Sequence, residues 1–266
     1  SAQVRTPDDL AVVAADFARH QAEQGVRWTE ATFTATTHVT NGMEPAAMWQ
    51  AVADGLADVP EARVGLIVDA VRNFGPENGD ATVRLVEQAG DAPVVALGLA
   101  GTETARSCTD YPMLRPAADR LGLGLVVHAG EIGPAAEVAA ALDHLRADRI
   151  GHGVAVADDP DVLSRVVRDQ VPLEVCPTSN VVLGAYPDHA SHPFPTLWSA
   201  GANVTVNSDD PPFFGTTLLD ELRHAERLAG LGRQDLATLQ RRAVRACFLP
   251  DDEAEALVAA IDAWGA

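Results

Sequence analysis

Two adjacent carboxylates follow a short apolar segment late in the chain. The segment from Asn203 to Ser208 contains alternating valines and runs into Asp209 and Asp210, after which come Pro211 and Pro212. Alternating β-branched residues favour a buried strand, and proline lacks the N–H that a strand needs, so the strand must end at the two acids. Paired acids at a strand end are suited to binding a metal or a substrate. For this stretch alone, capping of the following helix is the commoner alternative.

A histidine and a glutamate form a second candidate pair. His128 directly follows the apolar run 124–127, and Glu131 lies three residues later. Imidazole is a common metal ligand, and a carboxyl group one turn onward can face the same space as an acid. The spacing HxxE often occurs by chance, and a core histidine bonded to a carbonyl group is the alternative.

A histidine between two glycines and a glycine that follows a strand complete the set of candidates. His152 lies between Gly151 and Gly153, which leave its ring uncrowded and let a substrate approach the backbone, although the glycines could equally serve a simple turn. Gly101 follows another apolar run and could offer its N–H to a ligand atom. Each of these signals is weak by itself.

Taken together, these residues match a hydrolytic metal centre in type and placement. A histidine with an acid one turn away, a second histidine and an aspartate pair follow three different strand-like segments. The sequence contains no GxGxxG, GxxxxGK[ST] or GxSxG motif and no PCxxC motif of cytidine-type deaminases. Dinucleotide binding, P-loop chemistry and serine-hydrolase chemistry are therefore disfavoured.

The elements that must position these residues alternate between strand-like and helix-like segments. Apolar and β-branched runs predict strands at about 28–35, 63–70, 93–99, 124–127, 149–153, 172–175 and from residue 203. Helical patterns predict helices after each of them, including 44–57, 81–89, 112–121 and 134–146, and one earlier helix that begins at Thr6-Pro7. Seven such units predict an α/β fold of the TIM-type (β/α) barrel class, in one domain spanning 1–266, with functional residues at the carboxyl ends of the strands.

Composition limits the partners. The formal charge of −19 would repel nucleic acids and anionic membranes, and no apolar run approaches the ~20 residues that span a bilayer. Three widely spaced cysteines suggest neither a disulfide framework nor a thiolate zinc site, and they fit a cytoplasmic location.

Four blocks of this sequence resemble the adenosine deaminase family of metal-dependent amidohydrolases. The blocks are His128-Ala-Gly-Glu131, Arg149-Ile-Gly-His152-Gly153, Glu174-Val-Cys-Pro-Thr-Ser-Asn180 and Asn207-Ser-Asp209-Asp210-Pro211. The resemblance runs from about Trp28 to Phe248. It implies a TIM-type barrel, one zinc ion per complete site, and a hydrolase of purine metabolism that converts a 6-aminopurine nucleoside, as in adenosine to inosine.

The resemblance also assigns roles at the metal. It makes His128 and Asp209 zinc ligands, with Asp209 also touching the attacking water. His152 would orient and deprotonate the zinc-bound water, and the resulting hydroxide would attack C6 of the purine. Zinc lowers the pKa of its bound water toward ~7, which provides hydroxide at neutral pH.

Other residues would contact the purine. By the same resemblance, Glu131 would protonate N1, Asp210 would hold N7 and the backbone N–H of Gly101 would meet N3. Ser179 and Asn180 match a family block for which the residues alone indicate no direct role.

The chain departs from the family pattern at two places. Family members begin with a strand that carries an HxH pair of zinc ligands, and none of the eight histidines here forms that pair. We therefore expect the first of eight strands to be missing, zinc to be weakly held or absent in this chain, and the exposed barrel edges to favour homo-oligomers. His38 is a poor substitute ligand because it lies beyond the end of its strand. Gly98 stands where many relatives carry an aspartate beside the metal ligands.

The sequence leaves the substrate open. A 6-aminopurine nucleoside such as adenosine is the leading hypothesis, with aminodeoxyfutalosine, an intermediate of menaquinone synthesis, and free adenine as alternatives. A truncated, catalytically inactive barrel that binds a ligand or a partner chain is the alternative from a different class, since the HxH pair is absent.

Overall fold

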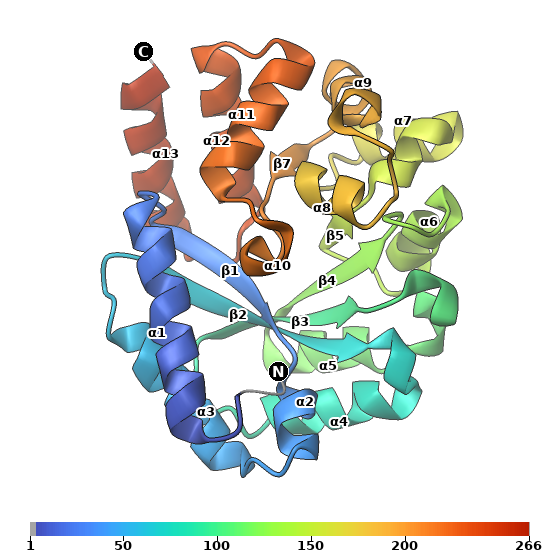
Figure 1. Ribbon diagram of the computed structural model, residues 1–266. Helices are drawn as coiled ribbons and strands as arrows, with labels where there is room; N and C mark the ends of the chain where they lie inside the picture. Colours follow the sequence, from blue (N-terminus) through green and yellow to red (C-terminus); the bar gives the residue numbers. More distant parts are fainter. Residues whose placement is uncertain (1–3, 266) are drawn as a thin grey trace. The chain divides into compact units, whose positions relative to one another are not determined.

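Seven parallel strands follow one another in chain order in the computed structural model, which describes residues 4–265 (Figure 1). They are β1 (Trp28–Phe33), β2 (Arg63–Val71), β3 (Val94–Ala100), β4 (Gly124–Ala129), β5 (Arg149–His152), β6 (Leu173–Val175) and β7 (Val204–Val206). Helices follow the strands along the chain. The prediction of a TIM-type (β/α) barrel with seven of its eight strands is confirmed.

The chain divides into two compact units, Ser1–Val126 and Val127–Ala266, and the boundary lies within β4. The first unit contains α1 (Pro7–Glu23), α2 (Ala35–Thr40), α3 (Pro45–Ala57), α4 (Pro76–Val86) and α5 (Leu114–Leu121), with short 3-10 turns at 72–74, 103–105 and 108–110. The prediction of one domain over 1–266 stays a prediction.

Helix α1 begins where its capping residues predict. The Thr6 hydroxyl accepts the N–H of Asp9 at 3.1 Å, and the Asp9 carboxylate accepts the N–H of Thr6 at 2.9 Å. Helix α1 packs beside α3 (Figure 1), and a Cβ at Gly55 of α3 would overlap the Ala11 carbonyl oxygen. Glycine at this position therefore lets the two helices approach closely.

Helix α4 spans Pro76–Val86, so the predicted bounds of 81–89 are wrong. Its first turn contains Asn78 and Gly79, which are poor helix formers. The Asn78 amide accepts the N–H of Val71 at 2.7 Å, and a Cβ at Gly79 would lie 2.9 Å from the Met113 sulfur. These contacts within the first unit override the weak local preference.

The second unit supplies the carboxyl end of β4, the strands β5 to β7 and the remaining α-helices. These are α6 (Ala135–His144), α7 (Pro160–Arg168), α8 (Pro177–Val182), α9 (Phe194–Ser199), α10 (Pro211–Phe214), α11 (Leu218–Ala229), α12 (Arg233–Ala246) and α13 (Asp251–Gly265), with 3-10 turns at 154–158 and 189–191. Strand β6 pairs with β5 and with β7 in parallel. The inward residues Ile150, Leu173 and Val204 are fully buried, which fixes the strands around one apolar core.

An ion pair with a buried guanidinium joins neighbouring strands of this unit. The Arg149 guanidinium on β5 lies 2.7 Å from the Glu174 carboxylate on β6, stacks over the Phe248 ring at 4.2 Å and donates to the carbonyl oxygen of Ala246 at 2.9 Å. The group ties the C-terminal helices to the strands.

Removing one partner of this pair should destabilise the protein. Glu174→Ala leaves a buried guanidinium without its carboxylate, which costs about 3 kcal/mol of unfolding free energy. Urea unfolding measures the loss. Glu255→Ala, which removes the exposed partner of Arg245, is the matched control and should cost less than about 1 kcal/mol. Equal losses in the two variants would contradict a structural role for Glu174.

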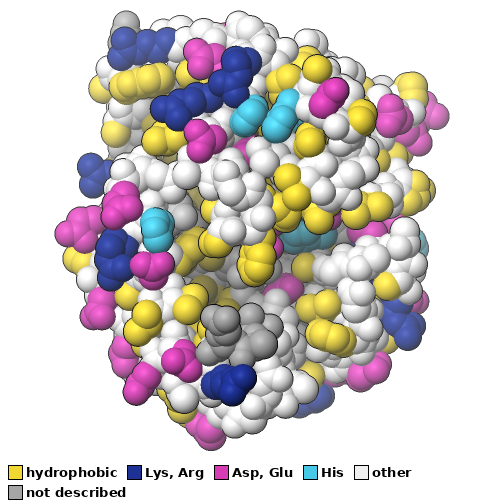
Figure 2. Space-filling view, in the orientation of Figure 1, with side chains coloured by type: hydrophobic (Ala, Val, Ile, Leu, Met, Phe, Trp, Pro, Cys, Tyr) yellow, Lys and Arg dark blue, Asp and Glu magenta, His cyan; other side chains and the backbone are white. Residues whose placement is uncertain are grey.

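The surface is strongly acidic, in keeping with the net charge of −19. Asp and Glu side chains are scattered over the face shown in Figure 2. Within residues 4–265, no helix combines the length and the apolar character needed to cross a membrane. The predicted homo-oligomer stays a prediction.

Candidate active site

The candidate catalytic residues gather after strands of the second unit. His128 is the second-to-last residue of β4, Glu131 follows that strand, His152 is the last residue of β5 and Asp209 follows β7. All four therefore come from the carboxyl ends of parallel strands, where (β/α) barrels place their functional residues.

His152 stands at the centre of this group. Its Nε2 atom lies 3.5 Å from Glu131 Oε1 and 3.7 Å from Asp209 Oδ2, and its ring centroid is 5.3 Å from that of His128. His152 is only 2% exposed. Burial, followed by the charges of His128 and His192, lowers the pKa of His152 well below its usual value, so the ring is neutral at pH 7.

Two of these side chains are held by unusual backbone conformations. His152 has φ of 60° and Asp209 has φ of 54°, in the left-handed region that non-glycine residues seldom adopt. Such a conformation costs on the order of 1–3 kcal/mol and is often found at functional sites. His152 is the last residue of β5 and Asp209 lies three residues after β7, so the unusual conformations occur where the chain leaves the sheet.

Gly151 makes room for His128. A Cβ at residue 151 would lie 3.0 Å from His128 Cγ and 3.1 Å from His128 Nδ1, closer than nearly all real contacts. The sequence had suggested that the glycine leaves the ring of His152 uncrowded. The structure shows instead that the ring of its neighbour on β4 occupies the space.

Gly151→Ala should displace His128. If His128 is a metal ligand, as its place in the sequence motif predicts, zinc affinity should fall about 10–100-fold, comparable to the loss of a residue that orients a ligand. Calorimetric zinc titration measures the change. Gly232→Ala is the matched control, because a Cβ there meets no atom closer than 3.8 Å, and its zinc affinity should not change.

Asp210 does not act as a simple helix cap. It occupies the N-cap position of α10, but its side chain makes no capping hydrogen bond. Partial burial of the carboxyl group and the neighbouring Asp209 raise the pKa of Asp210, while His128 lowers it in part. Asp210 therefore shares the electrostatic environment of Asp209 and His128, which is consistent with the predicted role in substrate binding.

Cys176 joins the group, which sequence reasoning did not predict. Within residues 4–265, the ligand atoms of His152, Cys176 and Asp209 lie within 4.8 Å of one another. Zinc binds imidazole, carboxylate and thiolate, so His152 and Asp209 offer suitable donors, whereas Cys176 would first have to lose its proton. The thiol is buried, and burial followed by the charges of Asp209 and Glu174 raises its pKa well above the usual value. The assignment of His128 and Asp209 as the metal ligands stays a prediction.

A buried amide and a buried carboxylate support the site from behind. Asn180 of α8 bridges the rings of His152 and His192. Glu221 of α11 accepts the N–H of Thr178 at 3.0 Å and the hydroxyl of Thr216, which fixes the start of α8. The sequence block at 174–180 included Asn180 but indicated no role for it. Nothing in the sequence near His192 or Glu221 predicted that these residues support the site.

Two residues considered from the sequence belong to the first unit. Gly101 follows β3 with φ of 88°, and a Cβ there would lie 2.6 Å from Asn73 Oδ1, so the turn requires glycine. Its contact with the purine stays a prediction. His38 lies in α2, stacks on Phe33 at 5.3 Å and has a pKa lowered by burial.

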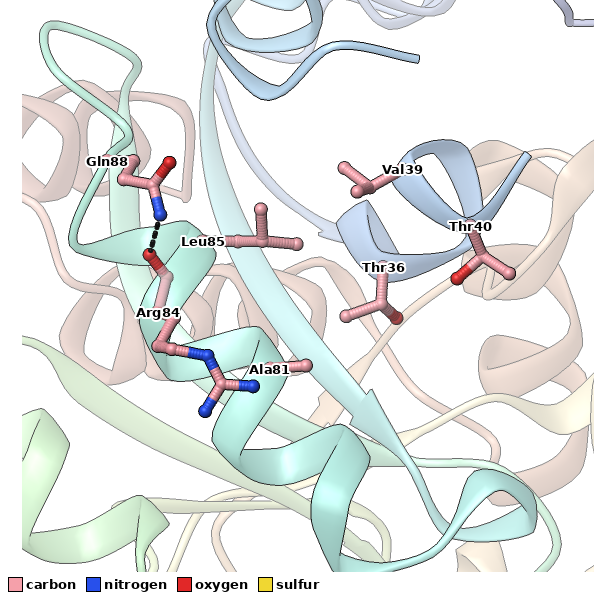
Figure 3. A pocket seen from close by; sticks show the side chains of 7 residues that line it. All are labelled: Thr36, Val39, Thr40, Ala81, Arg84, Leu85 and Gln88. Carbon is pink, nitrogen blue, oxygen red and sulfur yellow. Dashed lines mark hydrogen bonds between the residues drawn. The ribbon is translucent and has the colours of Figure 1, made fainter. Parts of the chain in front are cut away.

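The first unit also contains a cavity of about 240 Å³ between α2 and α4 (Figure 3). Thr36, Val39 and Thr40 line it from α2, and Ala81, Arg84, Leu85 and Gln88 line it from the α4 side. The Gln88 amide donates to the Arg84 carbonyl oxygen at 2.9 Å. None of the candidate catalytic residues lines this cavity, and its lining offers no acid–base pair.

A family model described as adenosine deaminase matches residues 1–264. The chain belongs to the adenosine deaminase family. An adenine deaminase of Chelativorans sp. strain BNC1 is 39% identical over 259 residues, covering 96% of this chain and 79% of the relative. An aminodeoxyfutalosine deaminase of Streptomyces avermitilis is 37% identical, covering 99% of this chain and 75% of the relative. Among solved structures, the adenine deaminase of Arthrobacter aurescens superposes with a TM-score of 0.91 at 32% identity, covering 98% and 80% of the two chains.

Family membership supports a metal-dependent deaminase reaction for this chain. The members named above are deaminases, and the family is metal-dependent, so a metal-dependent deaminase is supported for this chain. The four sequence blocks that predicted the family lie at the carboxyl ends of β4, β5, β6 and β7 in the structure.

Proposed function

We propose that this chain catalyses the hydrolytic deamination of a 6-aminopurine at C6, with zinc as the metal. Water and the aminopurine give the 6-oxopurine and ammonia. The observation that carries the proposal is the position of His152 Nε2 at the end of β5, 3.5 Å from Glu131, which follows β4, and 3.7 Å from Asp209, which follows β7. An imidazole between two carboxyl groups provides the donors and acceptors that addition of water to a ring carbon needs.

His128 and Asp209 would hold the metal. Zinc, when bound, supplies a Lewis acid that lowers the pKa of a water molecule to about 7. The residues must then orient that water toward C6 and exclude competing solvent. His152 is suited to this because its buried ring has one edge toward Asp209 and the other fixed by Asn180.

Glu131 would deliver a proton to N1 of the purine. Addition of water at C6 pushes electrons onto N1, and a carboxylic acid in contact with N1 prevents negative charge from accumulating on the ring. Glu131 lies three residues beyond His128, just after the end of the same strand, so we expect it to face the purine while His128 faces the metal. Asp210 and the N–H of Gly101 would hold N7 and N3.

Adenine is our first choice of substrate. Two relatives of this chain, at 39% and 32% identity, are adenine deaminases. Aminodeoxyfutalosine is the second candidate, supported by the relative at 37% identity. The nucleoside adenosine, predicted from the sequence motifs, remains a prediction that the same assay tests.

Parallel assays on the complete gene product distinguish these substrates. We expect ammonia release with the highest kcat/KM for adenine. A higher kcat/KM for adenosine or aminodeoxyfutalosine would reassign the substrate within the same reaction. Inactivity of the zinc-loaded protein with all three would contradict the proposed function and favour the non-catalytic barrel. The cytoplasmic location stays a prediction.

A further inference from the structure

A line of buried polar groups runs from the backbone of α9 to His152. It consists of the N–H of Phe194, the ring of His192, the amide of Asn180 and the ring of His152. His192 is 3% exposed, Asn180 0% and His152 2%. Because these groups are buried, they rely on one another for hydrogen bonds, and the direction of one bond constrains the direction of the next.

The backbone sets the direction at the first member. The N–H of Phe194 lies 3.1 Å from His192 Nδ1, and an amide N–H can only donate. Nδ1 of His192 therefore carries no proton. Burial, followed by the charge of His189, lowers the pKa of His192 to about 4, so the ring is neutral at pH 7 and its single proton is on Nε2.

The same reasoning extends to His152. The Nε2–H of His192 donates to Asn180 Oδ1 at 3.1 Å, which fixes the orientation of the amide. Asn180 Nδ2 then lies 3.2 Å from His152 Nδ1, and an amide NH₂ group can only donate. His152 Nδ1 is thus an acceptor without a proton.

We propose that His192 and Asn180 are positioning residues that keep the proton of His152 on Nε2, so that the ring faces Glu131 and Asp209 as a hydrogen-bond donor. The nearest carboxyl oxygens, Glu131 Oε1 and Asp209 Oδ2, lie 3.5 Å and 3.7 Å from Nε2, which are ion-pair distances longer than a normal hydrogen bond. The inference deepens the proposed function and rests on it for its catalytic meaning. The hydrogen-bond directions themselves do not depend on which reaction the site performs.

This tautomer defines what His152 can do. With a proton on Nε2, the ring has no lone pair on the side of Glu131 and Asp209. It would therefore orient the attacking water by donating a hydrogen bond to the water oxygen, and it could not accept a proton from that water. Removal of a proton from water by Nε2, the role that the sequence motif implied, would require the opposite tautomer.

Asn180→Asp is the direct test, because it keeps the shape of the side chain and reverses one hydrogen bond. A carboxylate accepts from both histidines, so His152 Nδ1 must then carry a proton. Long-range proton–nitrogen NMR on the histidine-labelled complete gene product reports which ring nitrogens are protonated, and His152→Gln assigns the signal. We expect His152 to be protonated on Nε2 alone in the natural protein and on Nδ1 in Asn180→Asp. A proton on Nδ1 in the natural protein, or no change in the variant, would overturn the proposal.

Kinetics separate positioning from a purely structural role. Asn180→Asp should lower kcat about 10³-fold with KM little changed, since an inverted tautomer of a catalytic histidine costs as much as ~10⁴ in kcat in serine proteases.

A second pair of variants changes His192, the residue that donates to Asn180. His192→Leu should give mixed protonation of His152 and a lower kcat, whereas His192→Gln keeps an N–H for Asn180 and should restore both. Equal His152 spectra in these two variants would contradict the proposed role of His192 and Asn180 as positioning residues. His189 is not a member of this line of buried polar groups, so His189→Ala should leave the His152 signal unchanged. The NMR result stands even if the protein proves to lack deaminase activity, so the two proposals fail separately.

Discussion

Glu131→Gln is expected to abolish nearly all turnover while leaving the metal bound. Glutamine keeps the shape of the side chain but cannot deliver a proton to N1, and general acid catalysis contributes about 10²–10⁴-fold to such steps. Glu131 lies 3.5 Å from His152 Nε2 and is not a predicted metal ligand, so zinc affinity should be unchanged.

The measurement pairs kcat with adenine and the zinc content per chain. Glu226→Gln, an exposed position on α11, is the control and should retain the natural rate. A Glu131→Gln protein with near-normal kcat would remove Glu131 from the mechanism, whereas loss of zinc would show that it acts on the metal instead.

Asp209→Ala is expected to lose both metal and turnover. As a predicted ligand that also lies 3.7 Å from His152, Asp209 serves the metal and the water that attacks the purine. Zinc affinity should fall at least 100-fold, more than the roughly 10–100-fold cost of losing a supporting residue. Calorimetric titration with zinc measures this loss.

Asp209→Asn separates charge from backbone strain. The φ of 54° at residue 209 is tolerated by asparagine and penalised in alanine. Thermal unfolding of the metal-free protein should therefore be unchanged in Asp209→Asn and lowered in Asp209→Ala, while both variants lose zinc. Unchanged zinc affinity in Asp209→Asn would show that Asp209 is not a ligand.

Much of the fold could be predicted from local patterns. The apolar runs located all seven strands, and Thr6-Pro7 located the start of α1, because these signals depend on residues next to one another in the chain. Short helices such as α2, α8 and α10 were not predicted. They span four to six residues, too few for a helical period to be visible.

The site was predictable only where a residue directly follows a strand. His128, Glu131, His152 and Asp209 satisfy that rule, and in the structure the carboxylates of Glu131 and Asp209 lie 3.5 Å and 3.7 Å from His152 Nε2. The partners of Asn180 and the place of Cys176 depend on how β5, β6 and the loop before α9 pack together. No local pattern encodes that packing, so these residues had to be found in the structure.

Metal removal tests the central claim most directly. The complete gene product should release ammonia from adenine, lose that activity on dialysis against a strong chelator, and recover it on addition of about one zinc ion per chain, as expected for a single site with a deprotonated ligand set. Full activity in protein stripped of its metal would contradict a metal-dependent deaminase.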